Sequence, residues 1–143
     1  MPYAALEDVQ AEFLNLTFTN ATPVTDSEVE DFIDTYSMVI DGWVSNRYAV
    51  PVTGSASLAM LKEVCVALVK SKIKRILARG AGAKQETQEK VALEIRKEAM
   101  DILRSIKKGE QDLHDATRKA PITTSYGYIN EQESVFKKDE DQW

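Results

Sequence analysis

The chain has 143 residues, of which 43% are hydrophobic and 29% are charged, and its formal net charge is −5. This length and composition fit one globular domain that buries its own apolar core, and they exclude collagen-like, transmembrane and wholly disordered chains. One histidine and one cysteine are too few for Cys/His zinc sites or iron–sulfur clusters, and without a P-loop, a GxGxxG or a GxSxG motif the sequence predicts no enzyme, no cofactor and no metal.

The first half of the chain predicts a short helix over residues 6–14 and a long helix over residues 26–47. Thr25-Asp26-Ser27-Glu28 has the form of a capping box, in which Thr25 caps the long helix and Glu28 returns to its backbone N–H. Apolar residues then recur at three- and four-residue steps, which is typical of one buried helix face. They are Val29, Phe32, Ile33, Tyr36, Ile40, Trp43 and Val44.

A second long helix is expected over residues 57–78, with Ser57 as its cap. Its middle, Val64-Cys65-Val66-Ala67-Leu68-Val69, is apolar on every side, which predicts the central helix of a bundle. A third helix is expected to open at Thr87 and to end before Gly109 as its C-cap. Its stripe consists of Val91, Ile95, Ala99, Ile102, Leu103 and Ile106. The predicted fold class is therefore all-α: a helical bundle of three long helices plus a short N-terminal helix.

The segment after Gly109 lacks a helical stripe, so the sequence predicts a helical domain over residues 1–109 and an extended C-terminal arm over residues 110–143. Residues 122–129 are β-prone, and residues 137–141 are charged and solvated. A frayed terminus without a role is one interpretation. The other is an arm that orders on a partner, with docking residues at Ile122, Tyr126, Tyr128 and Ile129.

Charge is segregated along the chain. Residues 1–61 hold nine acids and one base, residues 62–119 hold nine acids and fifteen bases, and residues 120–143 hold five acids and two bases. Within the central helix Lys72, Arg75 and Arg79 share one face. One interpretation of this distribution is the helix macrodipole, which by itself favours acids near a helix N-terminus and bases near a helix C-terminus. The other two interpretations are an acidic patch on a neighbouring subunit, which the acidic chain favours, and DNA.

Residues 37–52 resemble a phage protein family. Asp41-Gly42-Trp43, then Arg47-Tyr48-Ala49-Val50-Pro51, is similar to the pattern of the head–tail connector, or adaptor, proteins of Mu-like and related tailed phages. The opening over residues 3–8 and the closing helix and glycine over residues 99–109 also resemble that family. The resemblance spans about residues 3–112, with its elements in order.

The resemblance implies a structural virion protein in the neck, made in the host cytoplasm. Such proteins form a ring below the portal protein, with about twelve identical subunits by resemblance. They extend the channel through which DNA passes without sequence specificity, and they bind a downstream stopper or tail-completion protein. No membrane contact is expected. The start of the chain lacks the character of a signal peptide and Cys65 has no partner thiol, which also predicts a reducing cytoplasm.

A ring needs a heterologous contact between two different patches of neighbouring subunits. We expect acids of one subunit to approach bases of the next, and Arg47 to pair with Asp41 or with an acid of the neighbour. The expected contact residues are Asp31, Asp34, Asp41, Arg47, Lys72, Arg75 and Arg79. Gly42 interrupts a helix at a cost of about 1 kcal/mol, which predicts that a packing helix lies close to its backbone.

Two other functions compete with the adaptor. One is a helical nucleic-acid-binding module that uses the basic face of the central helix, and duplex binding with a steep salt dependence would identify it. That face consists of Lys70, Lys72, Lys74, Arg75 and Arg79. An enzyme is the third and weakest hypothesis, because a Ser-His-Asp triad would have to use His114, which lies in a polar stretch.

Overall fold

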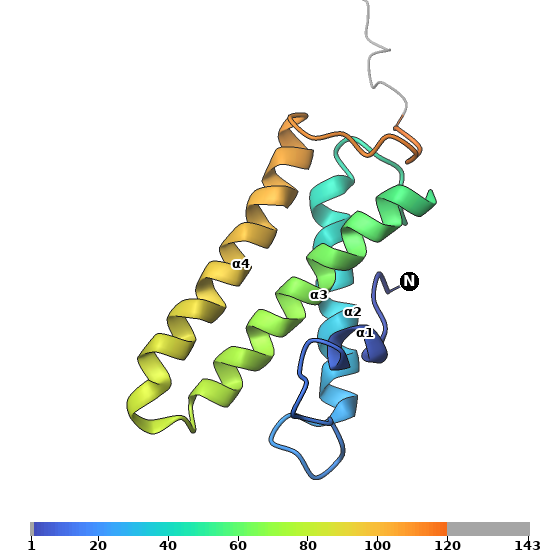
Figure 1. The fold of residues 1–143 in the computed structure, drawn as a ribbon. Coiled ribbons are helices and arrows are strands. Elements are labelled where there is room, and N and C mark those ends of the chain that lie inside the picture. Colours follow the sequence, from blue (N-terminus) through green and yellow to red (C-terminus); the bar gives the residue numbers. More distant parts are fainter. Residues whose placement is uncertain (1, 120–143) are drawn as a thin grey trace, which may run out of the picture.

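Three long helices and one short helix form the body of the protein (Figure 1). The computed structural model describes residues 2–119, and within these residues there is no β-strand. The helices are α1 (Leu6–Gln10), α2 (Asp26–Val44), α3 (Ser55–Ala78) and α4 (Gln85–Lys108), with a 3₁₀ turn, η1 (Gly82–Lys84), before α4. The predicted all-α bundle is confirmed. The predicted docking residues Ile122, Tyr126, Tyr128 and Ile129 lie outside the described residues.

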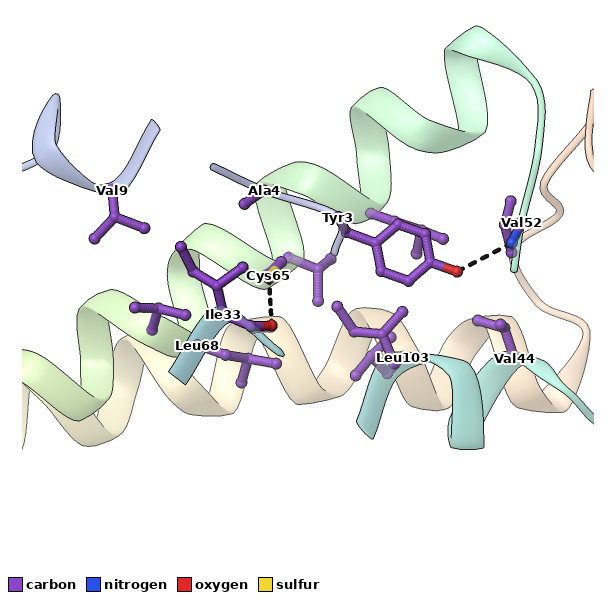
Figure 2. Packing of buried hydrophobic residues seen from close by; sticks show 14 of the residues in the cluster. Tyr3, Ala4, Val9, Ile33, Val44, Val52, Cys65, Leu68 and Leu103 are labelled. Carbon is purple, nitrogen blue, oxygen red and sulfur yellow. Dashed lines mark hydrogen bonds between the residues drawn. The ribbon is translucent and has the colours of Figure 1, made fainter. Parts of the chain in front are cut away.

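Helix α3 is the central element and packs against both α2 and α4 (Figure 1). The short helix α1 contacts α2 and α3. Figure 2 shows the core that results, in which side chains from all four helices meet around Cys65 and Leu68. Val64, Cys65, Leu68 and Val69 are buried, as the apolar run predicts. The two residues between them, Val66 and Ala67, are only half-buried, so α3 is not enclosed on every side.

The capping box of α2 is confirmed. The Thr25 hydroxyl accepts the Glu28 N–H at 3.1 Å, and the Glu28 carboxylate accepts the Thr25 N–H at 2.9 Å. The helix ends at Val44 rather than at residue 47, because the backbone beyond it pairs with a distant segment: the Arg47 carbonyl accepts the Lys119 N–H at 3.0 Å. The predicted helix 6–14 is likewise shorter and ends at Gln10.

The start of α3 differs from the prediction that Ser57 is its cap. Gly54 occupies the N-cap position with φ +103°, and the cap is supplied by the carboxylate of Asp115. This carboxylate accepts the Ala56 N–H at 2.8 Å and the Ser57 N–H at 3.0 Å, and the Ser57 hydroxyl also donates to it. A cap supplied by a residue far away in the sequence leaves no local signal.

Helix α4 starts at Gln85, two positions before the predicted Thr87, because η1 leads into it without a side-chain cap. Its predicted C-cap is confirmed, since Gly109 has φ +87°. The stripe of α4 is buried at Ala99, Leu103 and Ile106, but Val91 is 43% exposed and lines an open groove instead of the core.

Candidate functional site

Arg47 holds the end of α4. Its guanidinium donates to the Ile106 carbonyl at 3.0 Å and to the Asp112 carboxylate at 2.9 Å. The predicted pairing of Arg47 with Asp41 is therefore wrong. A cation suits this position because the last carbonyls of a helix are unpaired and carry partial negative charge. The hydrogen bond from Arg47 lowers the pKa of the Asp112 carboxyl below its usual value.

Tyr48 completes this contact with the chain after α4. Its side chain is fully buried, its hydroxyl accepts the Leu113 N–H at 2.9 Å, and the guanidinium carbons of Arg47 and Arg118 lie 5.3 and 5.5 Å from its ring centre. The backbone N–H of Ala49 donates to the Thr117 carbonyl at 2.7 Å. We call Arg47, Tyr48, Asp112 and Asp115 the clasp.

The clasp holds the part of the predicted arm that the structure describes. Residues 110–119 run across the end of the bundle where α2 and α4 end and α3 begins (Figure 1). Leu113 in this stretch is buried in the core. The clasp thereby fixes the point at which the chain continues beyond residue 119.

Tyr3 fixes residues 3–5, which precede α1 and which we call the N-terminal strap, against α2. Its backbone N–H donates to the Ser37 hydroxyl at 2.9 Å, its hydroxyl donates to the Asp41 carboxylate, and the same hydroxyl accepts the Val52 N–H at 3.1 Å (Figure 2). Burial and the Asp41 hydrogen bond raise the pKa of Tyr3 above its ordinary value. Asp41 is thus half-buried and already holds a partner within the chain.

An acidic trough lies beside this strap. It consists of two adjoining hollows, of about 480 and 330 Å³, that share Pro2 and Asp34 in their walls. Its acidic lining residues are Glu7, Glu30, Asp31, Asp34 and Asp41. No lysine or arginine among residues 2–119 lines either hollow. The structure therefore brings together the predicted contact acids Asp31, Asp34 and Asp41.

The predicted basic face divides into two groups. Lys70 pairs with Glu12 at 2.9 Å, and the ammonium groups of Lys72 and Lys74 lie 5.9 and 5.7 Å from the ring centres of Phe32 and Phe13. These three bases hold parts of their own subunit. Arg75 and Arg79 are exposed and, within residues 2–119, form no ion pair. The nucleic-acid hypothesis loses three of its five cations to internal contacts.

Cys65 and His114 are the one cysteine and the one histidine of the chain. Cys65 is buried, its thiol lies 3.9 Å from the Ile33 carbonyl oxygen, and burial raises its pKa to about 11 (Figure 2). His114 is exposed. Within the described residues no three His, Cys, Asp or Glu side chains lie close enough together to hold a metal. In the same part of the chain no helix is long and apolar enough to cross a membrane.

Sequence reasoning missed Tyr3, Asp112 and Asp115. Each acts on a residue far away in the chain and no periodicity marks it; of the three, Tyr3 alone lies in a segment that was singled out, the family-like opening over residues 3–8. The Arg47-Tyr48 pair was singled out by the family pattern, which is the one signal that pointed to the clasp.

Comparison with known proteins agrees with that signal. No curated protein and no solved structure matches the chain. The family model described as "Bacteriophage Mu, Gp36" matches residues 3–130, which include the N-terminal strap, all the helices and the clasp. The chain therefore belongs to the Bacteriophage Mu Gp36 family and is a Mu-like phage protein.

Proposed function

We propose that this protein is a head–tail connector: a ring of identical subunits below the portal protein that extends the DNA channel and joins the head to a stopper or tail-completion protein. The family supports a phage structural or morphogenetic role. The observation that carries the finer assignment is the distribution of charge on one subunit. Five acids line the trough without a base among the described residues, while Arg75 and Arg79 lie exposed on α3.

Two unlike, complementary surfaces on one chain favour head-to-tail association. A contact of this kind joins one patch to a different patch on the next copy, and it closes into a ring when the rotation fits. Ion pairs at such a rim contribute about 0–1 kcal/mol each, so they set orientation and register more than affinity. The acidity of the chain also disfavours adhesion of passing DNA to the channel wall.

The clasp supports a role for the chain beyond it. In our proposal residues 122–129, with Ile122, Tyr126, Tyr128 and Ile129, dock on the portal or on an adjacent subunit, and the clasp sets the place from which they depart. A chain that ends at Lys119 keeps every hydrogen bond of the clasp. It should fold as the full chain does and fail to join the portal. If the shortened chain completes heads as well as the full chain, residues 120–143 have no docking role.

The function is tested by removing the protein from an infection. A phage that lacks it should accumulate separate heads and tails, and supplying the wild-type chain in trans should restore joined particles. Joined, infectious particles in the absence of the protein would overturn the proposal. Loss of tails themselves, with heads unaffected, would assign the protein to tail assembly instead.

A further inference from the structure

The smaller hollow of the acidic trough is lined by two carboxylates, one hydroxyl and two apolar side chains. Asp34 and Asp41 line it together with Pro2, Ser37 and Met38, in a volume of about 330 Å³. Neither carboxylate forms an ion pair with any of residues 2–119. Two carboxylates that share a hollow attract a cationic side chain, because its charge is opposite and its N–H groups can donate hydrogen bonds to both.

No part of residues 2–119 covers the helix face around this hollow. Met38 is 67% exposed, and a Cβ at Gly42 would have no atom within 4 Å. The predicted close approach of a helix to Gly42 is therefore not made by any of residues 2–119. A mid-helix glycine and acids at helical spacings of three and four residues, such as Asp31 and Asp34, both cost helix stability. A neighbour that covers this face would offset those costs.

The surface that complements this face lies where α3 meets α4. Residues 79–84, which we call the α3–α4 tip, place Arg79 and Lys84 on either side of Gly80-Ala81-Gly82-Ala83. Both cations are exposed and, in the described part of the chain, have no acidic partner. The four small residues between them let the backbone approach a protruding side chain such as Met38. The tip thus has two cations on either side of small residues. The α2 face has two carboxylates, Asp34 and Asp41, on either side of Met38.

We propose that the α3–α4 tip of a second copy of this chain docks on the Met38–Gly42 face, with Arg79 or Lys84 entering the hollow between Asp34 and Asp41. This assignment rests on the proposed ring and names the two surfaces that form it. The tip lies at one end of α3 and α4, whereas the trough lies beside the N-terminus and α2 (Figure 1). Every subunit therefore offers both surfaces at once, and the contact repeats from copy to copy.

Cross-linking tests the contact directly, because the chain has one cysteine and it is buried. The double variant Met38→Cys/Ala83→Cys is treated with a short bismaleimide, both as concentrated purified protein and in assembled particles. We expect a ladder of dimers, trimers and larger species. A mixture of the two single variants should stop at dimers. Met38→Cys/Glu98→Cys, whose second cysteine lies on the exposed side of α4, should give less than a tenth of the cross-linked product.

Charge exchange gives a second, independent test of the contact. In the cysteine background, Asp31→Lys/Asp34→Lys should reduce cross-linking at least tenfold, and adding Arg79→Glu/Lys84→Glu should restore it. Glu94→Lys/Glu98→Lys, on the exposed side of α4, is the matched control and should leave the yield unchanged. Gly42→Leu should block the contact, and Gly42→Ala should retain most of it.

Three results would overturn the inference. The first is absence of the cross-linked ladder both in purified protein and in assembled particles, and the second is failure of the exchanged charges to restore cross-linking. The third is efficient dimer formation by Met38→Cys alone, which would indicate a symmetric contact between two α2 helices. Failure of this contact is distinguishable from failure of the proposed function. A ring on the portal without the Met38–Ala83 ladder rejects the contact and keeps the function. A ladder in a protein that never joins the portal rejects the function and keeps the contact.

Discussion

Substitution of Tyr48 with Phe isolates one hydrogen bond of the clasp. The Tyr48 ring is fully buried and its hydroxyl accepts the Leu113 N–H at 2.9 Å. Phenylalanine keeps the ring and its contacts with the two guanidinium groups, so the change removes only the hydroxyl group that accepts the Leu113 N–H. The Leu113 residue is 2% exposed, and its amide would be left in the core without a partner.

The expected cost follows from that burial. Leaving a buried donor unpaired costs about 1–3 kcal/mol, which is more than the net contribution of an average hydrogen bond. Tyr36→Phe is the matched control, because Tyr36 is half-buried and its hydroxyl makes no hydrogen bond with residues 2–119. Its effect should stay within about 0.5 kcal/mol.

Urea denaturation of the two variants measures the difference in the free energy of unfolding, and amide hydrogen exchange locates it. The exchange rate of the Leu113 amide should increase in Tyr48→Phe. The exchange rates of amides in the middle of α3 should change only by the amount that the lower global stability explains. Equal stabilities for the two variants, or an unchanged Leu113 amide, would refute the role of the clasp in holding residues 110–119.

Four further substitutions test the fold and its charges. Leu68→Ala should lower the free energy of unfolding by about 2–5 kcal/mol, measured in urea, because Leu68 is 1% exposed at the centre of the core. Gly42→Ala should raise it by about 0.5–1 kcal/mol, because the added methyl meets no atom within 4 Å; a loss of stability would contradict the open face. Gly54→Ala should destabilise the protein, since its Cβ would lie 2.5 Å from Asp115 Cγ at φ +103°, and an unchanged Tm would reject that geometry. The hydrogen bonds from Ser57 and Ala56 lower the pKa of Asp115 in the folded protein. The Asp115 carboxylate therefore stabilises the fold fully above its unfolded pKa of about 3.9, and this stabilisation is lost as pH falls through the lower folded pKa. Asp115→Asn should flatten the pH dependence of Tm in that acidic range.

The helices could be predicted because their signals are local. The capping box at Thr25 and the apolar stripe of α2 lie within a few residues of one another, and both follow from helix geometry. Gly109 is predictable for the same reason, since a left-handed C-cap favours glycine wherever the rest of the chain lies.

The ends of helices that are completed by distant residues could not be predicted. The N-terminus of α3 is capped by Asp115, 59 residues after Ala56, and Arg47 finds its partner 65 residues away at Asp112. Gly42 illustrates the opposite error. Its place in a helix predicts a close packing helix, but a Cβ at Gly42 would meet no atom of residues 2–119 within 4 Å.

The acidic trough could be predicted in composition but not in shape. Charge counting identifies acids in the first part of the chain, and α2 carries Asp31, Asp34 and Asp41 along its length, with Asp34 and Asp41 about two turns apart. The hollow between them exists because Tyr3 pins the N-terminal strap, and Pro2 with it, against α2. The basic group divides because Lys70, Lys72 and Lys74 meet side chains of the N-terminal segment and of α2.

The most direct measurement is electron microscopy of the purified protein mixed with the portal of the same phage. The account predicts a closed ring at the narrow end of the portal, with the α3–α4 tip of each subunit against α2 of the next. A portal that stays bare at that end, at protein concentrations well above those in an infected cell, would contradict the connector function.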